Sequence, residues 1–448
     1  MIPDAPSSGL LLPSRLRAEP APEAAQWPDA SWWRGFGSAE LDKLMAAAIA
    51  SNSDIRAAAA RVRQADAQLR VAAQALLPTG NLSFSAQRSQ TPRAPAPAIS
   101  TAGGGRFVQR ESFAASLGAS YEVDFWGRAR NVTEAARQSA EASRFDAATV
   151  GLTITSSVAN TYFAVLANQE LLANQEQNLA LALRTLGIIR QRVAVGTATG
   201  LELAQQEALV AQLRAAIPAI RQAVEQNRNA LGTLTGQPPQ AVPMPAQKID
   251  ELRLPPVSAG LPAEVLVRRP DVWFAEASLA SAQANVAAAR AALLPAVQLT
   301  ASGGVQSLVL ENLLRPGSSL YTLAAGLTQP VFQWGALRAQ LQLQRGRAEE
   351  LLENYRKAIL AALVDTENSL VALRETTEQE RLQREATAAA ARAFEISAAR
   401  LEAGTIDLIT LLNTQTTLFN ARNQLVQARL ARLQAAVGLF RALGGGWS

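Results

Sequence analysis

The sequence predicts a mainly α-helical protein with a smaller β-strand part, built from an internal duplication. Three observations predict this fold class. Two very long stretches, 128–195 and 336–403, contain no proline and carry apolar residues at helical spacing. Short segments of alternating polarity precede each of them, and the whole order occurs twice. At 1.5 Å per residue each long helix would reach about 100 Å, so we expect an extended helical scaffold instead of a globular core.

The composition excludes most enzyme chemistry. Cysteine and histidine are absent, and lysine occurs only at Lys43, Lys248 and Lys357. A zinc site of the Cys/His type, a Ser-His-Asp triad and a catalytic thiol are therefore excluded, while chemistry that uses carboxylates alone stays open. We expect no enzyme, no metal site and no cofactor.

The charge pattern argues against a nucleic-acid partner. Lys and Arg total 42 against 37 Asp and Glu, but the arginines are scattered along the helical stretches without interleaved aromatic residues, as on solvated helix faces. The chain has no run of 18 or more apolar residues, so no transmembrane helix is expected. Residues 1–28 lack the basic and apolar parts of a signal peptide, which predicts either a cytosolic protein or a mature form whose signal has been removed.

The duplication divides the chain into four parts. An N-terminal segment, 1–53, precedes the first repeat at 54–240, and a connecting segment, 241–270, leads into the second repeat at 271–448. The first copy carries a short insertion in the Pro/Gly/Ala-rich stretch 91–110, which predicts a longer loop there. Residues that match between the copies at one constant spacing are Gly118 and Gly326, Trp126-Gly127 and Trp334-Gly335, Asn160 and Asn368, Gly196-Thr197 and Gly404-Thr405, and Gly236 and Gly444.

Each repeat is expected to contain an opening helix, a long helix and a returning helix. The opening helices are expected at 54–77 and 271–294, and the returning helices at 201–235 and 409–443. Pro218 lies inside the first returning helix and is expected to kink it. Apolar residues recur every seven positions, which predicts helix–helix packing. These residues are Val158, Val165, Leu172, Leu179, Leu186 and Val193, then Leu203, Val210, Ile217, Val224 and Leu231, and later Leu412, Phe419, Val426, Leu433 and Phe440.

Two strands per repeat are expected between the opening and long helices, at about 80–90, 112–124, 296–307 and 319–332. Alternation of apolar and small polar residues fits a membrane β-barrel strand and fits a half-buried soluble sheet equally well. The apolar positions are Leu82, Phe84, Phe113, Ala115, Leu117, Ala119, Tyr121, Val123, Val297, Leu299, Ala301, Tyr321, Leu323, Ala325, Leu327 and Val331.

Four strands per chain constrain the membrane alternative. A closed barrel needs about eight strands or more, and an open sheet cannot lie in lipid, where every backbone polar group must be paired. If the strands lie in a membrane, several chains must therefore share one barrel. Three chains would supply twelve strands and enough helices for a hollow tube.

Several stretches in the expected order resemble a known family. The chain resembles the TolC-like outer membrane efflux proteins, in particular the outer membrane factor subgroup (OprM/NodT-like) of resistance-nodulation-division tripartite pumps. The resemblance implies a trimeric twelve-stranded outer membrane β-barrel, continuous with a long periplasmic α-helical barrel, and an equatorial region built from the termini and segment 241–270. The stretches that carry it are Trp32-Trp33-Arg34-Gly35-Phe36-Gly37, Tyr121 to Arg128, Arg268-Arg269-Pro270-Asp271-Val272 leading into 287–292, Thr328-Gln329-Pro330-Val331-Phe332, and Ala442 to Trp447.

The function that this resemblance implies is a passive exit duct for drugs or other small toxic molecules. The implied partners are two further copies in a homotrimer, a periplasmic adaptor protein, an inner-membrane resistance-nodulation-division pump and outer membrane lipid. Many relatives begin with a lipidated cysteine, which this chain lacks. Alternatives are a channel for type I protein secretion or for metal-ion efflux and, from a different class, a soluble coiled-coil scaffold.

The resemblance also implies a closed aperture at the periplasmic end, narrowed by apolar and aspartate side chains early in the second returning helix. Ile409 and Asn413 match those positions, and their first-copy counterparts are Leu201 and Gln205. Because Asn replaces the acid, we expect a steric, hydrogen-bonded constriction instead of a charged ring. Asp407 either supplies charge near the tip or is an acid favoured at a helix N-terminus.

The turns between long and returning helices are the expected tips of the helical barrel. The resemblance implies that the adaptor contacts them, whereas glycine at such a turn also simply terminates a helix. The six residues concerned are Val195, Gly196, Thr197, Ala403, Gly404 and Thr405.

Overall fold

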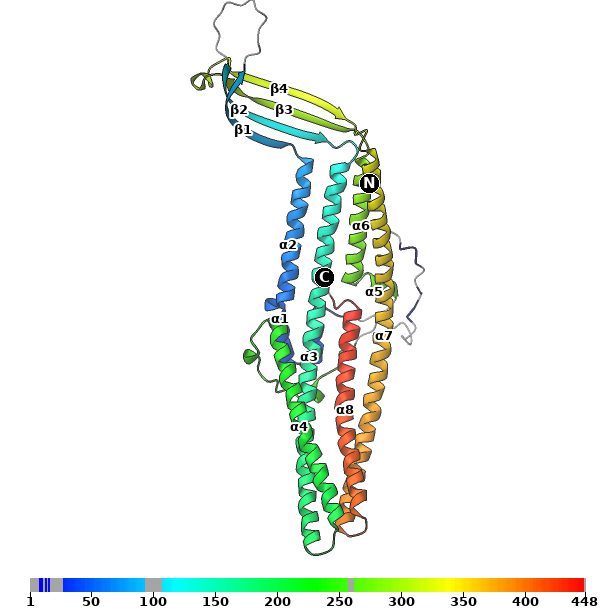
Figure 1. The fold of residues 1–448 in the computed structure, drawn as a ribbon. Coiled ribbons are helices and arrows are strands. Elements are labelled where there is room, and N and C mark those ends of the chain that lie inside the picture. The colour runs from blue at the N-terminus through cyan, green and yellow to red at the C-terminus, as the bar shows by residue number, and fades with distance from the viewer. Residues whose placement is uncertain are drawn as a thin grey trace, which may run out of the picture. The chain divides into compact units, whose positions relative to one another are not determined.

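The computed structural model describes residues 8–10, 13, 15–16, 27–92, 107–256 and 262–446 (Figure 1). These residues form two compact units. The strand unit contains the described parts of 63–141 and 276–353, and the bundle unit contains those of 7–62, 142–275 and 354–448. Four of the described helices have their first residues in one unit and their last residues in the other, so the two units are covalently continuous.

In the described part of the chain, twelve α-helices and β-strands follow one another in two similar series. Each helix or strand that was predicted from the sequence is present, and its ends differ from the predicted ends by a few residues. In chain order they are α1 (Ala39–Ser51), α2 (Ser53–Ala73), β1 (Thr79–Pro92), β2 (Phe107–Val123), α3 (Arg128–Ala194), α4 (Gly200–Thr235), α5 (Pro262–Leu266), α6 (Pro270–Ala291), β3 (Ala296–Ser307), β4 (Ser319–Thr328), α7 (Trp334–Glu402) and α8 (Leu408–Ala442).

Two expectations about these elements are wrong, and two of the described helices, α1 and α5, were not predicted. The stretch 91–110 is not all loop, because β1 continues to Pro92 and β2 begins at Phe107; residues 93–106 lie outside the described part. β4 ends at Thr328 and not at 332, because Pro330 has no N–H to donate to a sheet. Helix α1 was not expected, although Ser38 is its N-cap and accepts a hydrogen bond from the Leu41 N–H.

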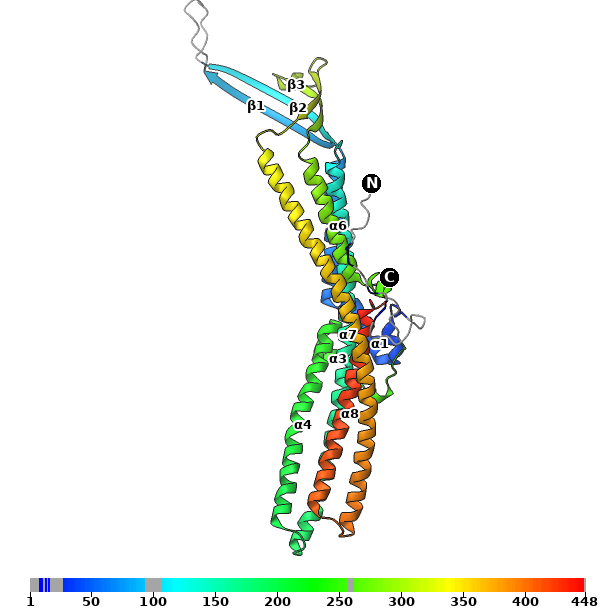
Figure 2. The ribbon, with the colours of Figure 1, turned by 90° about the vertical axis from the view of Figure 1, so that its right-hand side faces the viewer.

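The strand unit contains one antiparallel sheet in the order β1-β2-β3-β4 (Figure 1), and Figure 2 shows its paired strands β1 and β2 side by side. Its register separates two faces, because residues directly opposite each other point to the same side. One face carries Leu82, Leu117 and Tyr321 in a single cross-strand row, and all three are exposed. The other face carries small polar residues, among which the Ser83 and Ser116 hydroxyls lie 2.9 Å apart. The predicted alternation is confirmed.

The core of the bundle unit explains the tryptophan-rich N-terminal motif. Trp32 and Phe36 lie on a 3₁₀-helix and are buried. Trp32 stacks on Phe440 of α8 at a centroid distance of 5.2 Å, and Phe36 lies 5.0 Å from Phe163 of α3. The motif therefore joins the N-terminal segment to two helices that are distant in sequence. The last residue of the C-terminal motif, Trp447, lies outside the described residues.

The Arg-Arg-Pro-Asp-Val motif also has a packing role. Arg269 is 8% exposed, and its guanidinium donates to Asp271 at 2.7 Å, to Asp365 of α7 at 3.0 Å and to the Ala442 carbonyl of α8 at 3.0 Å. A buried charge needs several partners to offset the loss of water. Arg269 thus fixes the start of α6 against α7 and the end of α8.

The end of the bundle unit that carries the α3–α4 and α7–α8 turns is formed by these four helices (Figure 1). Ala182 and Leu186 of α3 pack against Val210 of α4 and Phe419 of α8. A second cluster joins α7 and α8. The residues of the predicted heptad pattern are buried or partly buried, so the prediction of helix–helix packing is confirmed. α4 is helical on both sides of Pro218.

One helix among the described residues, α3, contains a window apolar enough to cross a membrane. However, 56% of that window is buried inside the molecule. Much of its apolar character therefore serves internal packing, as in Tyr162, Phe163 and Leu166.

Candidate functional site: the helical tips and the returning helices

The turn at each tip ends its long helix in the same way. After α3, the Gly196 N–H donates to the Val193 carbonyl at 3.0 Å, and the Thr197 N–H donates to the Arg192 carbonyl at 2.8 Å. After α7, Gly404 and Thr405 repeat this pattern at 3.1 and 2.9 Å. The glycines have φ of 72° and 70°, and this arrangement is the Schellman motif. Glycine is required here by its conformation, which explains the matching Gly-Thr pairs.

Both returning helices begin with a side-chain cap. Thr199 caps α4, with Glu202 completing a capping box, and Asp407 caps α8 by accepting from the Thr410 N–H at 2.9 Å. Hydrogen bonds from the Thr410 side chain and N–H hold the pKa of Asp407 below its ordinary value. The helix-start alternative for Asp407 therefore has direct structural support, while its role as a source of charge at the aperture stays a prediction.

Contacts between the two hairpins hold the tip together. The Arg192 guanidinium of α3 donates to the Leu401 carbonyl of α7 at 3.1 Å. Beside it, Ile189 of α3 lies in one apolar cluster with Leu408 and Leu411 of α8. Sequence reasoning missed this tie, because an arginine near a helix end has no distinctive spacing.

The four expected gate residues are exposed in the single chain. Leu201 is 66% and Ile409 50% exposed, and Gln205 and Asn413, one helical turn further on, are exposed as well. The structure places Leu201 with Gln205 on one face of α4, and Ile409 with Asn413 on one face of α8.

At the tips, Val195, Gly196, Thr197, Ala403, Gly404 and Thr405 are all exposed. Val195 is 73% exposed, and a Cβ added to Gly196 or Gly404 would meet no atom within 4 Å. The tips therefore present an open, small-residue surface that another protein can approach closely.

The strand unit carries exposed aromatic residues where strands meet helices. Phe125 and Trp126 follow β2, and Phe332 follows β4; all three are exposed. The Trp126 indole donates to the Pro295 carbonyl at 2.8 Å, which fixes the ring at this end of the sheet. Aromatic residues at the border of an apolar outer face are typical of outer membrane β-barrels.

The sheet with one exposed apolar face and the paired long helices together define an outer membrane channel of the barrel-and-helical-tunnel class. The family model described as "Outer membrane efflux protein" matches residues 44–237 and 261–445, and the chain belongs to this family. It is thus the outer membrane exit duct of a tripartite efflux pump, with its β-barrel in the outer membrane and its helical barrel in the periplasm.

Similar proteins and structures agree with this assignment. The chain is 43% identical over 440 residues to the pyoverdine export outer membrane protein OpmQ of Pseudomonas aeruginosa, covering 98% of this chain and 92% of that protein. It is 31% identical to the toluene efflux pump outer membrane protein TtgC of Pseudomonas putida, covering 95% and 90%. The open-state structure of the Neisseria gonorrhoeae MtrE outer membrane channel matches with a TM-score of 0.87 at 28% identity, covering 100% and 98%.

Proposed function

We propose that three copies of this chain form a passive duct for small organic molecules, gated at the helical tips and joined there to a periplasmic adaptor and an inner-membrane resistance-nodulation-division pump. In this proposal, segments 1–53 and 241–270 form the equatorial region, and 54–240 and 271–448 are the two repeats. Leu201, Gln205, Ile409 and Asn413 would form the constriction. The tip turns would contact the adaptor.

The proposal of a trimer is supported mainly by the four-stranded sheet. Within the described part of the chain, β1 and β4 each pair on one side only. Their second edges need partners in lipid, and the apolar face formed by Leu82, Leu117 and Tyr321 needs an apolar environment. Three copies would satisfy both requirements with a closed twelve-stranded barrel.

The cargo is proposed from the relatives. Two proteins described as pyoverdine export outer membrane proteins are 43% and 40% identical to this chain, whereas the toluene and antibiotic efflux proteins are 31% identical. We therefore expect pyoverdine-type cargo to be exported in preference to toluene. A Pseudomonas aeruginosa strain without OpmQ that expresses this chain should recover pyoverdine in the medium, and a Pseudomonas putida strain without TtgC should recover less toluene tolerance. The reverse result would contradict the cargo proposal.

The gate is testable because the chain has no cysteine of its own. With Asn413→Cys, an oxidant should link neighbouring copies if the three residues converge, and export should stop until a reductant is added. Gln427→Cys, on the same face of α8 and about 21 Å further from the tip at 1.5 Å per residue, is the matched control and should not link. Linking at 427 but not at 413 would contradict the proposed constriction.

A further inference from the structure

The face of α4 that begins with Leu201 and Gln205 stays uncharged far beyond the proposed gate. At about 100° per residue, every third or fourth residue lies on this face. The exposed residues along it are Leu201, Gln205, Ala208, Gln212, Ala215, Ala219, Gln222 and Gln226. Over about 38 Å at 1.5 Å per residue, this neutral stripe of α4 presents only amide and aliphatic groups.

The corresponding face of α8 has the same character. Starting from Ile409 and Asn413, the exposed residues that follow on that side carry amide or hydroxyl groups. They are Thr416, Thr417, Asn420, Gln424 and Gln427. The neutral stripe of α8 is therefore a second uncharged surface, in the other copy of the repeat.

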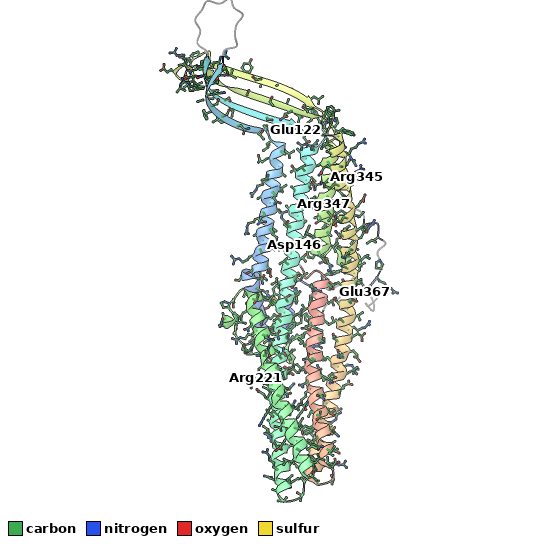
Figure 3. All side chains as sticks on the ribbon, viewed as in Figure 1. Glu122, Asp146, Arg221, Arg345, Arg347 and Glu367 are labelled. Atoms are coloured by element: carbon green, nitrogen blue, oxygen red, sulfur yellow. The ribbon has the colours of Figure 1, made fainter. Side chains whose placement is uncertain are left out.

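Between Leu201 and Gln226 of α4, and between Ile409 and Gln427 of α8, the charged residues lie on other faces. On α4, Glu207 and Arg221 form ion pairs with Arg190 and Glu176 of α3, each at 2.9 Å; Figure 3 marks Arg221 on α4. On α8, Arg432 pairs with the buried Glu380 of α7 at 2.8 Å. Along both stripes, charged and neutral side chains therefore lie on different sides of the helix.

Two arginines at matching positions of the repeats illustrate how charged side chains are kept away from the neutral stripes. Arg214 of α4 matches Arg422 of α8 between the two repeats. Each arginine is two residues from a neutral-stripe residue, Gln212 or Gln424, and therefore points about 160° away from it around the helix. A glutamine on one side and an arginine on the other is the arrangement expected when only one side must stay neutral.

We propose that the neutral stripes of α4 and α8 line the periplasmic part of the duct and that the wall surface they form does not select the charge of the cargo. This inference rests on the proposed function and names its substrate class: small polar organic molecules that are anionic, cationic or neutral. Fixed charges on a channel wall concentrate ions of one sign and exclude the other. Amide and hydroxyl groups donate and accept hydrogen bonds with any polar cargo and select no sign.

The first test measures the electric potential at the wall with single thiols in the cysteine-free chain. Asn420→Cys should react with cationic and anionic methanethiosulfonate reagents of equal size at a rate ratio close to that of a small free thiol. A ratio shifted tenfold, which corresponds to about 1.4 kcal/mol, would mean a charged wall and would overturn the inference. A thiol that reacts with neither reagent would lie in a packed interface, which would overturn it as well.

The second test uses the matched positions in planar bilayers. Gln424→Glu and Arg422→Gln each lower the charge by one on the same helix, but we expect only Gln424→Glu to raise the K⁺ over Cl⁻ permeability ratio several-fold. Gln424→Lys should lower the ratio. If variants at 424 do not assemble, Gln212→Glu and Arg214→Gln on α4 provide the same comparison. An equal or larger effect of the arginine variants would overturn the inference, whereas the absence of both trimer and conductance in the unmodified protein would contradict the proposed function instead.

Discussion

At the scale of single residues, glycines have two different tasks in this protein. Gly236 and Gly444 follow the returning helices with φ of 67° and 89°, and a Cβ at either position would collide with the backbone of Ser51 or Arg268. At the tips, Gly196 and Gly404 also have positive φ, but open space surrounds them. The first pair allows close packing of the chain, and the second pair allows only the turn.

This difference predicts the effect of alanine at each glycine. Gly196→Ala and Gly404→Ala should cost about 1–2 kcal/mol each, because an alanine disfavours the left-handed conformation. Gly236→Ala and Gly444→Ala should cost about 1–3 kcal/mol more, because the backbone must also move to relieve the collision. Thermal unfolding in detergent, followed by circular dichroism, should rank the melting temperatures in this order. Equal losses at all four positions would contradict the assignment.

The Asp407 cap predicts a pH dependence at the second tip. The pKa of Asp407 is lowered in the folded protein, so the cap contributes stability above the unfolded pKa of about 3.9 and loses it as the pH falls through the lower folded value. Hydrogen exchange in the first turn of α8 should thus become several-fold less protected in strong acid. Asp407→Asn, whose amide oxygen still accepts a hydrogen bond, should show less of this change, and Asp407→Ala should be poorly protected at every pH.

At the scale of elements, strand pairing depends on close approach between β2 and β3. A Cβ at Gly304 of β3 would collide with the backbone of Ala115, whereas Gly326 of β4 has no atom within 4 Å of the added carbon. Both glycines lie within paired strands. Close packing of backbone against backbone is therefore required at one position and not at the other.

Gly304→Val should consequently disrupt barrel assembly, and Gly326→Val should leave it intact. The expected readout is the fraction of protein that migrates as a trimer after mild detergent extraction, with Gly304→Val reduced at least several-fold. A trimer fraction for Gly304→Val equal to that of the unmodified protein would show that the β2–β3 contact tolerates a side chain.

At the scale of the whole molecule, the exposed apolar sheet face, and the edges of β1 and β4 that pair with no other described strand, predict how the purified protein behaves. Extraction should require detergent, and light scattering corrected for bound detergent should give about three times the 47.5 kDa of one chain. A monomer that remains in solution without detergent would be incompatible with a shared barrel.

The sequence by itself determined the order of the opening, long and returning helices and of the strands, the duplication and the two faces of the sheet. These features depend on local periodicity and on glycine conformation, which each residue carries wherever the chain lies. The tips could also be predicted, because the Gly-Thr pairs end both long helices in one way.

Only the tertiary structure decided which side chains meet across the chain. The roles of Arg269 and Trp32 depend on α7 and α8, which lie far away in sequence, so no local pattern reveals them. The same holds for the neutral stripes: glutamine and alanine are common on any helix surface, and their meaning depends on where the neighbouring helices bury one side. Burial is a property of the packed molecule, and for that reason the separation of charged from neutral faces became visible only in the fold.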